Sequence, residues 1–380
     1  MQQAKIVEGQ QIWICRVLCI FFMMSVHVNP GLSGPSLISA GGLTWLGTVW
    51  VELLGRTSVA ALSFISGYLL VRTAASRPLH VVAGRKLRTL IVPMLTWNLL
   101  FCALLVVEAI LKDLPADRRL VVDPVAALTG LTGATANRSL FFLRDLFVSA
   151  LIVRLLLPGL RRWPILLLGI AVVAVLDAAE PLVFRPTILL FVAAGAVAAQ
   201  RVTVLADLVR PRLVLPAVVL LLLALALSHA GAHDANAILR EARNIVLRTL
   251  LTIGALAASL GLVATGPGRW LARREKDMFA SYLLHAPLIA LLWQPWRVLV
   301  GGPMAASYLV FFLAAPVAAI LAGQWVDAAA DRLPPALQLA VRGRARRPAS
   351  AASAAPAAPA APIPAGALPD PLLARGDRLP

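Results

Sequence analysis

The sequence predicts an all-α polytopic membrane protein, a bundle of about ten transmembrane helices with both chain termini in the cytoplasm. Hydrophobic residues make up 60% of the 380 positions, and the mean hydropathy of +0.84 is typical of a chain that lies mostly in lipid. These residues are grouped in runs of about 17 to 25, the length that crosses a bilayer as a helix. Lys and Arg are concentrated in short segments between the runs. Together these features argue against a large soluble core.

The predicted spans follow the apolar runs in order, and the fifth and sixth are short enough to be tilted or partly re-entrant. No small-residue cleavage site follows the first run, so we expect it to be kept as the first span. The spans cover residues 12–28, 46–71, 90–111, 139–158, 164–177, 187–200, 213–229, 245–264, 279–298 and 306–326.

The basic residues predict the side of the membrane that each loop occupies. With ten spans the most basic segments fall on one side, namely residues 72–89, 201–212 and 266–277, with Arg161 and Arg162. Cytoplasmic loops carry the excess of Lys and Arg, so this side and both termini are predicted to be cytoplasmic. On the opposite side, residues 29–45 contain no Lys or Arg, whereas residues 112–138 contain four and reduce the contrast.

The composition divides the chain into two regions. Beyond about Ala328 the sequence becomes rich in Ala, Pro and Arg, with too little apolar bulk to build a core. We therefore predict a transmembrane domain over residues 1–327 and a disordered cytoplasmic tail over residues 328–380.

Charge, cysteines and histidine spacing exclude several classes. The net charge of +17 does not indicate nucleic-acid binding, because the basic residues flank apolar runs instead of forming one surface. Cys15, Cys19 and Cys102 lie within apolar runs and predict no disulfide framework. His229 and His233 have the spacing of a metal pair but lack an obvious third ligand, so no metal site is predicted.

Arg16 and His27 lie inside the first predicted span, where an ionisable group requires a partner or a function. At about 100° and about 1.5 Å per residue, the two side chains share one helix face roughly 16 Å apart. A histidine can take a proton from an attacking hydroxyl group and return it, which is general-base catalysis. His27 is thus a candidate base with Arg16 as its partner. Alternatively, Arg16 only extends its charge to lipid phosphate at the near surface of the bilayer.

A second cationic group, Arg85, Lys86 and Arg88, stands just before Pro93 at the start of the third span. Arg85 and Arg88 are three residues apart, so on a helix they project from one face, and guanidinium groups bind phosphate oxygens in pairs. Such a face at the cytoplasmic entrance suits a phosphorylated soluble donor. The alternative is charge that only sets topology or binds anionic lipid.

The ninth span contains Tyr282 and His285, three residues apart on one face, followed by Pro287. A proline in a helix frees a backbone carbonyl, which can then face a cavity. Tyr282 and His285 are therefore candidates to line a substrate cavity. The alternative is a histidine whose hydrogen bonds are satisfied by a neighbouring helix.

Further polar residues interrupt other spans. Arg144 and Asp145 are adjacent, so we expect them to point to different sides and to bind different partners, either in function or in fixing the bundle. Glu52 and Arg56 are four residues apart and are interpreted as an internal ion pair. Gly67, with the serines just before it, gives the second span a small surface on which another helix can pack closely.

Taken together, these residues resemble the acyltransferase-3 family of integral membrane acyltransferases. The resemblance covers about residues 12–300 and rests on motifs in the family's order. They are Arg16 followed by His27, residues 64–70 (FISGYLL), residues 85–88 (RKLR), residues 142–147 (FLRDLF, similar to fucose acetylase-like members) and residues 281–288 (SYLLHAPL).

The resemblance implies an enzyme of the bacterial cytoplasmic (inner) membrane that moves an acyl group, most simply acetyl, from cytoplasmic acyl-CoA to a hydroxyl of an exported or surface glycan or glycolipid. Acyl-CoA is the expected donor substrate, with no permanently bound cofactor, and polysaccharide-assembly proteins are candidate partners. The implied roles are phosphate binding by Arg85, Lys86 and Arg88, general-base catalysis by His27 or, alternatively, transient acyl transfer through it, and stabilisation of negative charge on the donor or oxyanion by Arg16. Tyr282, His285, Arg144 and Asp145 are expected to line the substrate site.

Two other classes remain open at this point. In a multi-pass transporter or flippase for a glycan precursor, the same buried charges would line a permeation path. The lack of a visible internal repeat weighs against transporter folds built from two homologous halves. A non-catalytic bundle that scaffolds polysaccharide assembly is the third possibility.

Overall fold

The computed structural model describes residues 2–28, 36–38, 43–111, 123–133, 135–162, 165–177, 184–209, 216, 218–223 and 236–345. Within these ranges the chain is helical and contains no strand, as predicted. The principal helices are α1 (Gln2–Val28), η1 (Gly47–Gly55), α3 (Arg56–Ala74), α4 (Leu79–Lys86), η2 (Leu87–Ile91), α5 (Val92–Leu111), α7 (Pro124–Thr129), η3 (Arg138–Leu140), α8 (Phe141–Arg162), α9 (Leu166–Leu176), α10 (Pro186–Arg201), α12 (Ala237–Leu262), α13 (Gly266–Arg274), α14 (Met278–Leu299), α15 (Ser307–Ala330) and α16 (Pro335–Arg342).

Among the described residues, five helical segments are long and apolar enough to cross a membrane: Gln2–Val28, Gly47–Ala74, Leu79–Leu111, Ala237–Leu262 and Ser307–Ala330. The predicted fifth and sixth spans correspond to α9 and α10, which are apolar but shorter. Most of the predicted seventh span, residues 213–229, lies outside the described residues. The chain is therefore an all-α integral membrane protein.

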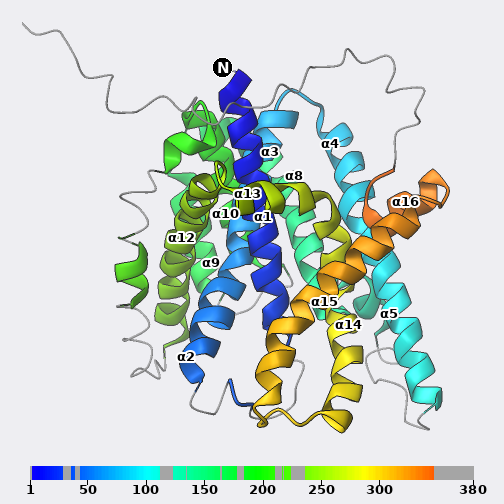
Figure 1. Cartoon of the computed structure of the whole chain (residues 1–380). Coiled ribbons are helices and arrows are strands. Elements are labelled where there is room, and N and C mark those ends of the chain that lie inside the picture. The colour runs from blue at the N-terminus through cyan, green and yellow to red at the C-terminus, as the bar shows by residue number, and fades with distance from the viewer. Residues whose placement is uncertain are drawn as a thin grey trace, which may run out of the picture. The chain divides into compact units, whose positions relative to one another are not determined.

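The first predicted span, α1, is surrounded by other helices. It packs against η1, α3, α12, α14 and α15, and Figure 1 shows it in dark blue between α3 and α15. Ile14, Cys15 and Met24 are fully buried, and the side chain of Gln11 donates a hydrogen bond of 3.0 Å to the carbonyl oxygen of Leu256 in α12. Arg16 and His27 therefore lie next to other helices of the protein and not only next to lipid tails.

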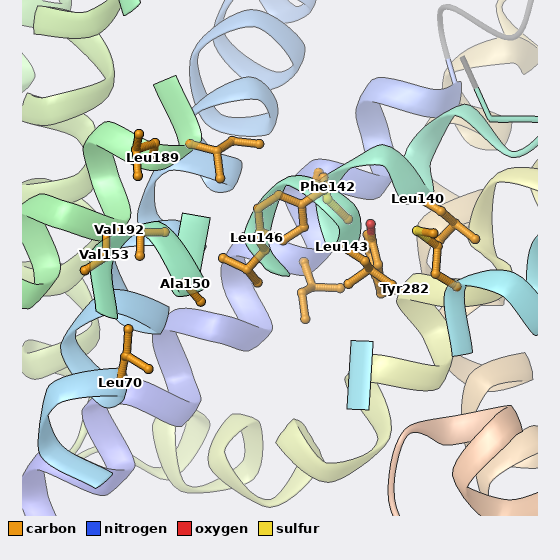
Figure 2. Close-up of a cluster of buried hydrophobic side chains, with 14 of the residues drawn as sticks. Leu70, Leu140, Phe142, Leu143, Leu146, Ala150, Val153, Leu189, Val192 and Tyr282 are labelled. Carbon is orange, nitrogen blue, oxygen red and sulfur yellow. The ribbon is translucent and has the colours of Figure 1, made fainter. Parts of the chain in front are cut away.

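One face of α8 supplies much of the largest apolar cluster. Positions 142–146 are all buried, and from Leu146 to Val153 the buried residues recur every three or four positions, the spacing that places them on one side of a helix. Figure 2 shows them meeting side chains of α3, α10 and α14: Phe142, Leu143, Leu146, Ala150 and Val153 of α8 lie with Leu70, Leu189, Val192 and Tyr282. This packing fixes α8 and its preceding segment relative to the rest of the bundle.

The helices α3 and α10 approach each other through glycines. A β-carbon on Gly67 would overlap the backbone of Val192 in α10, and one on Gly195 would overlap the backbone of Phe64 in α3. Only residues without a side chain allow such an approach, which is the usual device for close helix contacts in membranes. The predicted small surface at Gly67 is confirmed.

A short helix follows the last span. α16 (Pro335–Arg342) lies within the region predicted to be tail, and the indole N–H of Trp97 in α5 donates a hydrogen bond of 2.8 Å to the carbonyl oxygen of Val341. Arg342 forms ion pairs with Asp327 (3.4 Å) and Asp331 (2.7 Å). Ordered structure thus continues beyond Ala328 to Ala345, because these polar contacts replace the missing apolar bulk. Residues 346–380 lie outside the described part of the chain.

Candidate active site

His27 lies in the last turn of α1 and faces a cavity of about 750 Å³. Residues from α1, α3, α5, α10, α12 and α14, with the segment that leads into α8, form the wall of this cavity. Its volume falls within the range of sites that enclose a small-molecule ligand. A histidine on such a wall can reach a hydroxyl group that enters the cavity.

His285 of α14 lies directly against His27. The two ring centroids are 4.8 Å apart, with the rings edge to face. Nδ1 of His285 is 2.6 Å from the backbone oxygen of Tyr282, so Nδ1 carries the hydrogen and Nε2 has the free lone pair. Nε2 is buried and has no hydrogen-bond partner among the described residues. The predicted base therefore has a second histidine beside it that is completely buried and outside the cavity lining.

Tyr282 does not line the cavity but holds part of its wall. Its hydroxyl group donates a hydrogen bond of 2.7 Å to the carbonyl oxygen of Ser139, which does line the cavity. The side chain of the neighbouring Asn137 donates to the carbonyl oxygen of Leu283 at 3.4 Å. Leu283 is four residues before Pro287, so this is the carbonyl that the proline frees. Tyr282 and the freed carbonyl thus fasten the segment before α8 to α14.

Arg144 and Asp145 were expected to point to different sides and to bind different partners. Each does bind a partner of its own, but the two side chains also bind each other. The guanidinium of Arg144 binds the carboxylate of Asp145 itself, through Nε at 2.8 Å and Nη2 at 2.7 Å. Rotation about the long arginine side chain brings adjacent residues together although their Cβ atoms diverge. Arg144 also donates to the carbonyl oxygen of Gly130 after α7, and Asp145 accepts from the backbone N–H of Arg185 at 3.3 Å. Neither belongs to the cavity lining.

Arg16 lies three turns from His27 towards the N-terminal end of α1. Its guanidinium forms an ion pair with Glu275, between α13 and α14, and both side chains are partly buried. The helical rise places Arg16 roughly 16 Å from His27 along the axis. One acyl carbon cannot contact both residues, which disfavours Arg16 as the group that stabilises the oxyanion at His27.

The three basic residues at the start of the third span divide between two environments. Arg85 and Arg88 are exposed, whereas Lys86 is partly buried, with Nζ 3.5 Å from the hydroxyl oxygen of Ser66. Lys86 also lies within electrostatic range of Arg16 and Arg85. The π-helical turns of η2 begin at Leu87, between Lys86 and Arg88. The predicted donor-binding residues thus gather at the Arg16 end of α1, away from the cavity.

Four arginines on the cavity wall were not singled out as functional by the sequence. Arg56 had been interpreted as the partner of Glu52, whose side chain lies outside the described part; the other three are Arg138, Arg185 and Arg248. One sequence feature could have pointed to them: they lie on or near the predicted outer side, where basic residues are not needed to set the topology.

The comparisons with known proteins agree with these motifs. The family model described as an acyltransferase domain matches residues 11–323, most of the chain. The chain belongs to the acyltransferase-3 family. Among curated relatives of this family, the succinoglycan biosynthesis protein ExoH of Rhizobium meliloti (strain 1021) is 30% identical over 321 residues, which cover 81% of this chain and 84% of ExoH. No solved structure matches the chain.

As a member of the acyltransferase-3 family, the chain is a membrane-embedded acyltransferase. Among the described residues no group of three His, Cys, Asp or Glu side chains could hold a metal ion, while His229 and His233 lie outside those residues. The structure thus brings His27 and His285 together at one end of α1. It places Arg16, about three turns away, within electrostatic range of Lys86.

Proposed function

We propose that this protein transfers an acyl group, most simply acetyl, from cytoplasmic acyl-CoA to a hydroxyl group of an exported or surface glycan or glycolipid. The observation that carries the proposal is the position of His27 on the wall of a cavity large enough for a ligand, with a second histidine against it. The name of ExoH, a succinoglycan biosynthesis protein, supports a glycan as the acceptor.

The proposed topology has ten spans and both termini in the cytoplasm of a bacterial inner membrane. Glu8 of α1 accepts hydrogen bonds from Tyr68 and from the backbone of Leu205, and Arg72 donates to the carbonyl oxygen of Val202 at 2.8 Å. The basic ends of α3 and α10 therefore lie beside the N-terminus of the chain. Clustered positive charge at one end of the bundle supports the cytoplasm as its location.

The donor would bind with its phosphates on Arg85 and Arg88 and with its acyl chain directed past Lys86 and Arg16. Two exposed guanidinium groups on neighbouring turns suit phosphate oxygens. Ile20 and Met23 lie between Arg16 and His27 on the same face of α1 and are buried. The thioester therefore reaches His27 only when these apolar side chains or their neighbours move.

The chemical step uses His27 as general base. The imidazole of His27 takes the proton of the acceptor hydroxyl while the hydroxyl oxygen attacks the thioester carbonyl carbon. The tetrahedral intermediate collapses with loss of the CoA thiolate, which takes the proton back from the imidazolium. His285, outside the cavity lining, packs edge to face against His27 and restricts the orientation of its ring.

A transfer assay tests the catalytic assignment. Protein reconstituted in nanodiscs receives labelled acetyl-CoA and the glycan fraction of a deletion strain, and mass spectrometry follows the acetyl mass on the glycan. We expect His27→Ala to abolish transfer, because His27 is the only histidine among the described residues that line the cavity. His80→Ala, an exposed histidine of α4, is the matched control. Wild-type transfer by His27→Ala would refute the assignment.

The donor site is tested separately by acyl-CoA affinity. Reversing the charge of Arg85 and Arg88 together should raise the Kd for acetyl-CoA by roughly tenfold or more, if each lost phosphate contact contributes about 1 kcal/mol. Arg161→Glu with Arg162→Glu makes the same charge change at exposed positions at the end of α8. An equal effect of both pairs would mean general electrostatics instead of a phosphate site. Export of unmodified glycan without acyl-CoA would instead support the transporter.

A further inference from the structure

The charged side chains that line the cavity beside His27 are all arginines. Arg56, Arg138, Arg185 and Arg248 line it, and its described lining residues include no Asp or Glu. The four arginines come from α3, η3, the start of α10 and α12. Positive charges around a cavity with low-dielectric walls reinforce one another and raise the local concentration of anions. Neither general-base catalysis nor positive-inside topology requires this charge.

Arg185 is held in a fixed position at the start of α10. Its backbone N–H donates to the carboxylate of Asp145 at 3.3 Å, and Pro186 occupies the first helical position. The guanidinium carbon lies 3.7 Å from the centre of the Phe141 ring. No carboxylate of the described residues forms an ion pair with the Arg185 side chain. A guanidinium stacked on an aromatic ring keeps its in-plane N–H groups available for two parallel bonds to an oxyanion.

Arg248 differs in that it already has a carboxylate nearby. It forms an ion pair of 3.4 Å with Glu241 of the same helix, and both side chains are partly buried. The carboxylate of Glu241 offsets much of this charge, although Arg248 itself lines the cavity. Arg185 is therefore the arginine best placed to bind a ligand directly, and the others strengthen its field.

The size of the cavity indicates which substrate occupies it. A volume of about 750 Å³ suits a whole small-molecule ligand, whereas a short acyl group would fill only a small part of it. Building on the proposed function, we propose that the acceptor carries an anionic group, a carboxylate or a phosphate, and that Arg185, with Arg56 and Arg248, binds this group while His27 takes the acceptor's hydroxyl proton.

Binding of small probes tests this proposal with the full-length protein in nanodiscs. The probes are methyl glucuronide, which carries a carboxylate, glucose 1-phosphate, which carries a phosphate, and neutral methyl glucoside of similar size. We expect one or both anionic probes to bind more tightly than the glucoside, and the tighter of the two identifies the anion. Arg185→Gln should raise its Kd by roughly tenfold, the effect of about 1.4 kcal/mol.

Two further variants separate possible outcomes. Arg297→Gln removes an exposed arginine of α14 that is outside the cavity lining, so it should leave the Kd unchanged. His27→Ala should keep anion binding while losing acyl transfer. If His27→Ala retained acyl transfer, the proposed function would be wrong, but the proposed anion site would be unaffected. Equal binding of neutral and anionic probes, or no effect of Arg185→Gln, would overturn the anion site alone.

The anionic group could also belong to the donor, as in succinyl-CoA. Transfer from succinyl-CoA and acetyl-CoA is therefore compared in Arg185→Gln and in the Arg297→Gln control. If Arg185→Gln lowered only succinyl transfer and left the Kd of the sugar probes unchanged, the arginine would recognise the acyl group, and the proposal of an anionic acceptor would be wrong.

Discussion

Replacement of Tyr282 by Phe tests whether this tyrosine takes part in chemistry or holds the cavity wall. The side chain is 3% exposed, its ring packs near Phe279 and Phe142, and its hydroxyl donates to the carbonyl oxygen of Ser139 at 2.7 Å. Tyr282→Phe removes one oxygen atom and leaves the ring contacts in place. The carbonyl oxygen of Ser139 then loses this donor.

The expected loss of stability follows from that single bond. A buried acceptor left without its donor costs about 1–3 kcal/mol in soluble proteins. Hydrogen bonds between membrane helices contribute less, about 0.6 kcal/mol on average and about 1.7 at most. We therefore expect Tyr282→Phe to lower the free energy of unfolding by about 1 kcal/mol. Since the hydroxyl is bonded to the wall and not to substrate, kcat should fall by no more than about tenfold.

The assay combines thermal unfolding of the purified protein with steady-state acyl transfer. Tyr308→Phe is a matched control, because Tyr308 is also buried and its hydroxyl bonds to Ser36 in a different apolar cluster. Both variants should unfold at lower temperature, and only Tyr282→Phe should change kcat or KM. A roughly thousandfold loss of kcat by Tyr282→Phe with unchanged thermal stability would refute the positioning role, because losses of that size indicate proton transfer.

Three further substitutions test the packing and the ion pairs. Gly195→Ala should destabilise the protein by about 1–3 kcal/mol, because the added β-carbon overlaps the backbone of α3. Gly169→Ala is the control, since Gly169 has open space around it and its replacement should leave stability unchanged. Equal unfolding temperatures of the two variants would contradict this prediction. Arg16→Glu combined with Glu275→Arg should restore the thermal stability lost in Arg16→Glu alone but not acyl transfer, and recovery of both would show that Arg16 is only structural. Arg144→Met should cost about 3–5 kcal/mol, because it leaves the adjacent buried carboxylate unpaired; unfolding at the wild-type temperature would show that this carboxylate is compensated elsewhere.

Several features could be predicted locally. Hydrophobic runs of bilayer length predicted the helices, because a chain in lipid must satisfy its backbone hydrogen bonds within each segment. The helical repeat placed Arg16 and His27 on one face of α1, and the proline rule predicted a freed carbonyl before Pro287, which is that of Leu283. Each of these inferences depends on residues within a few turns of one another.

Other features depend on contacts between distant segments. The ion pair between Arg144 and Asp145 was not expected, because Cβ directions alone do not show where a long side chain ends. Tyr282 was expected to line the cavity, but the rotation of α14 turns its hydroxyl towards Ser139. The rotation of a helix about its axis is set by the helices that pack against it, and a single sequence does not show which helices those are.

The sequence by itself determined that this chain is a helical membrane protein, that it resembles the acyltransferase-3 family, and that α1 carries a basic and a titratable residue on one face. These properties follow from composition and from a fixed helical period. Only the tertiary structure placed His285 against His27 and gathered arginines from α3, η3, α10 and α12 around one cavity. That convergence arises because apolar faces such as that of α8 and the glycines between α3 and α10 decide how close helices lie and which sides meet.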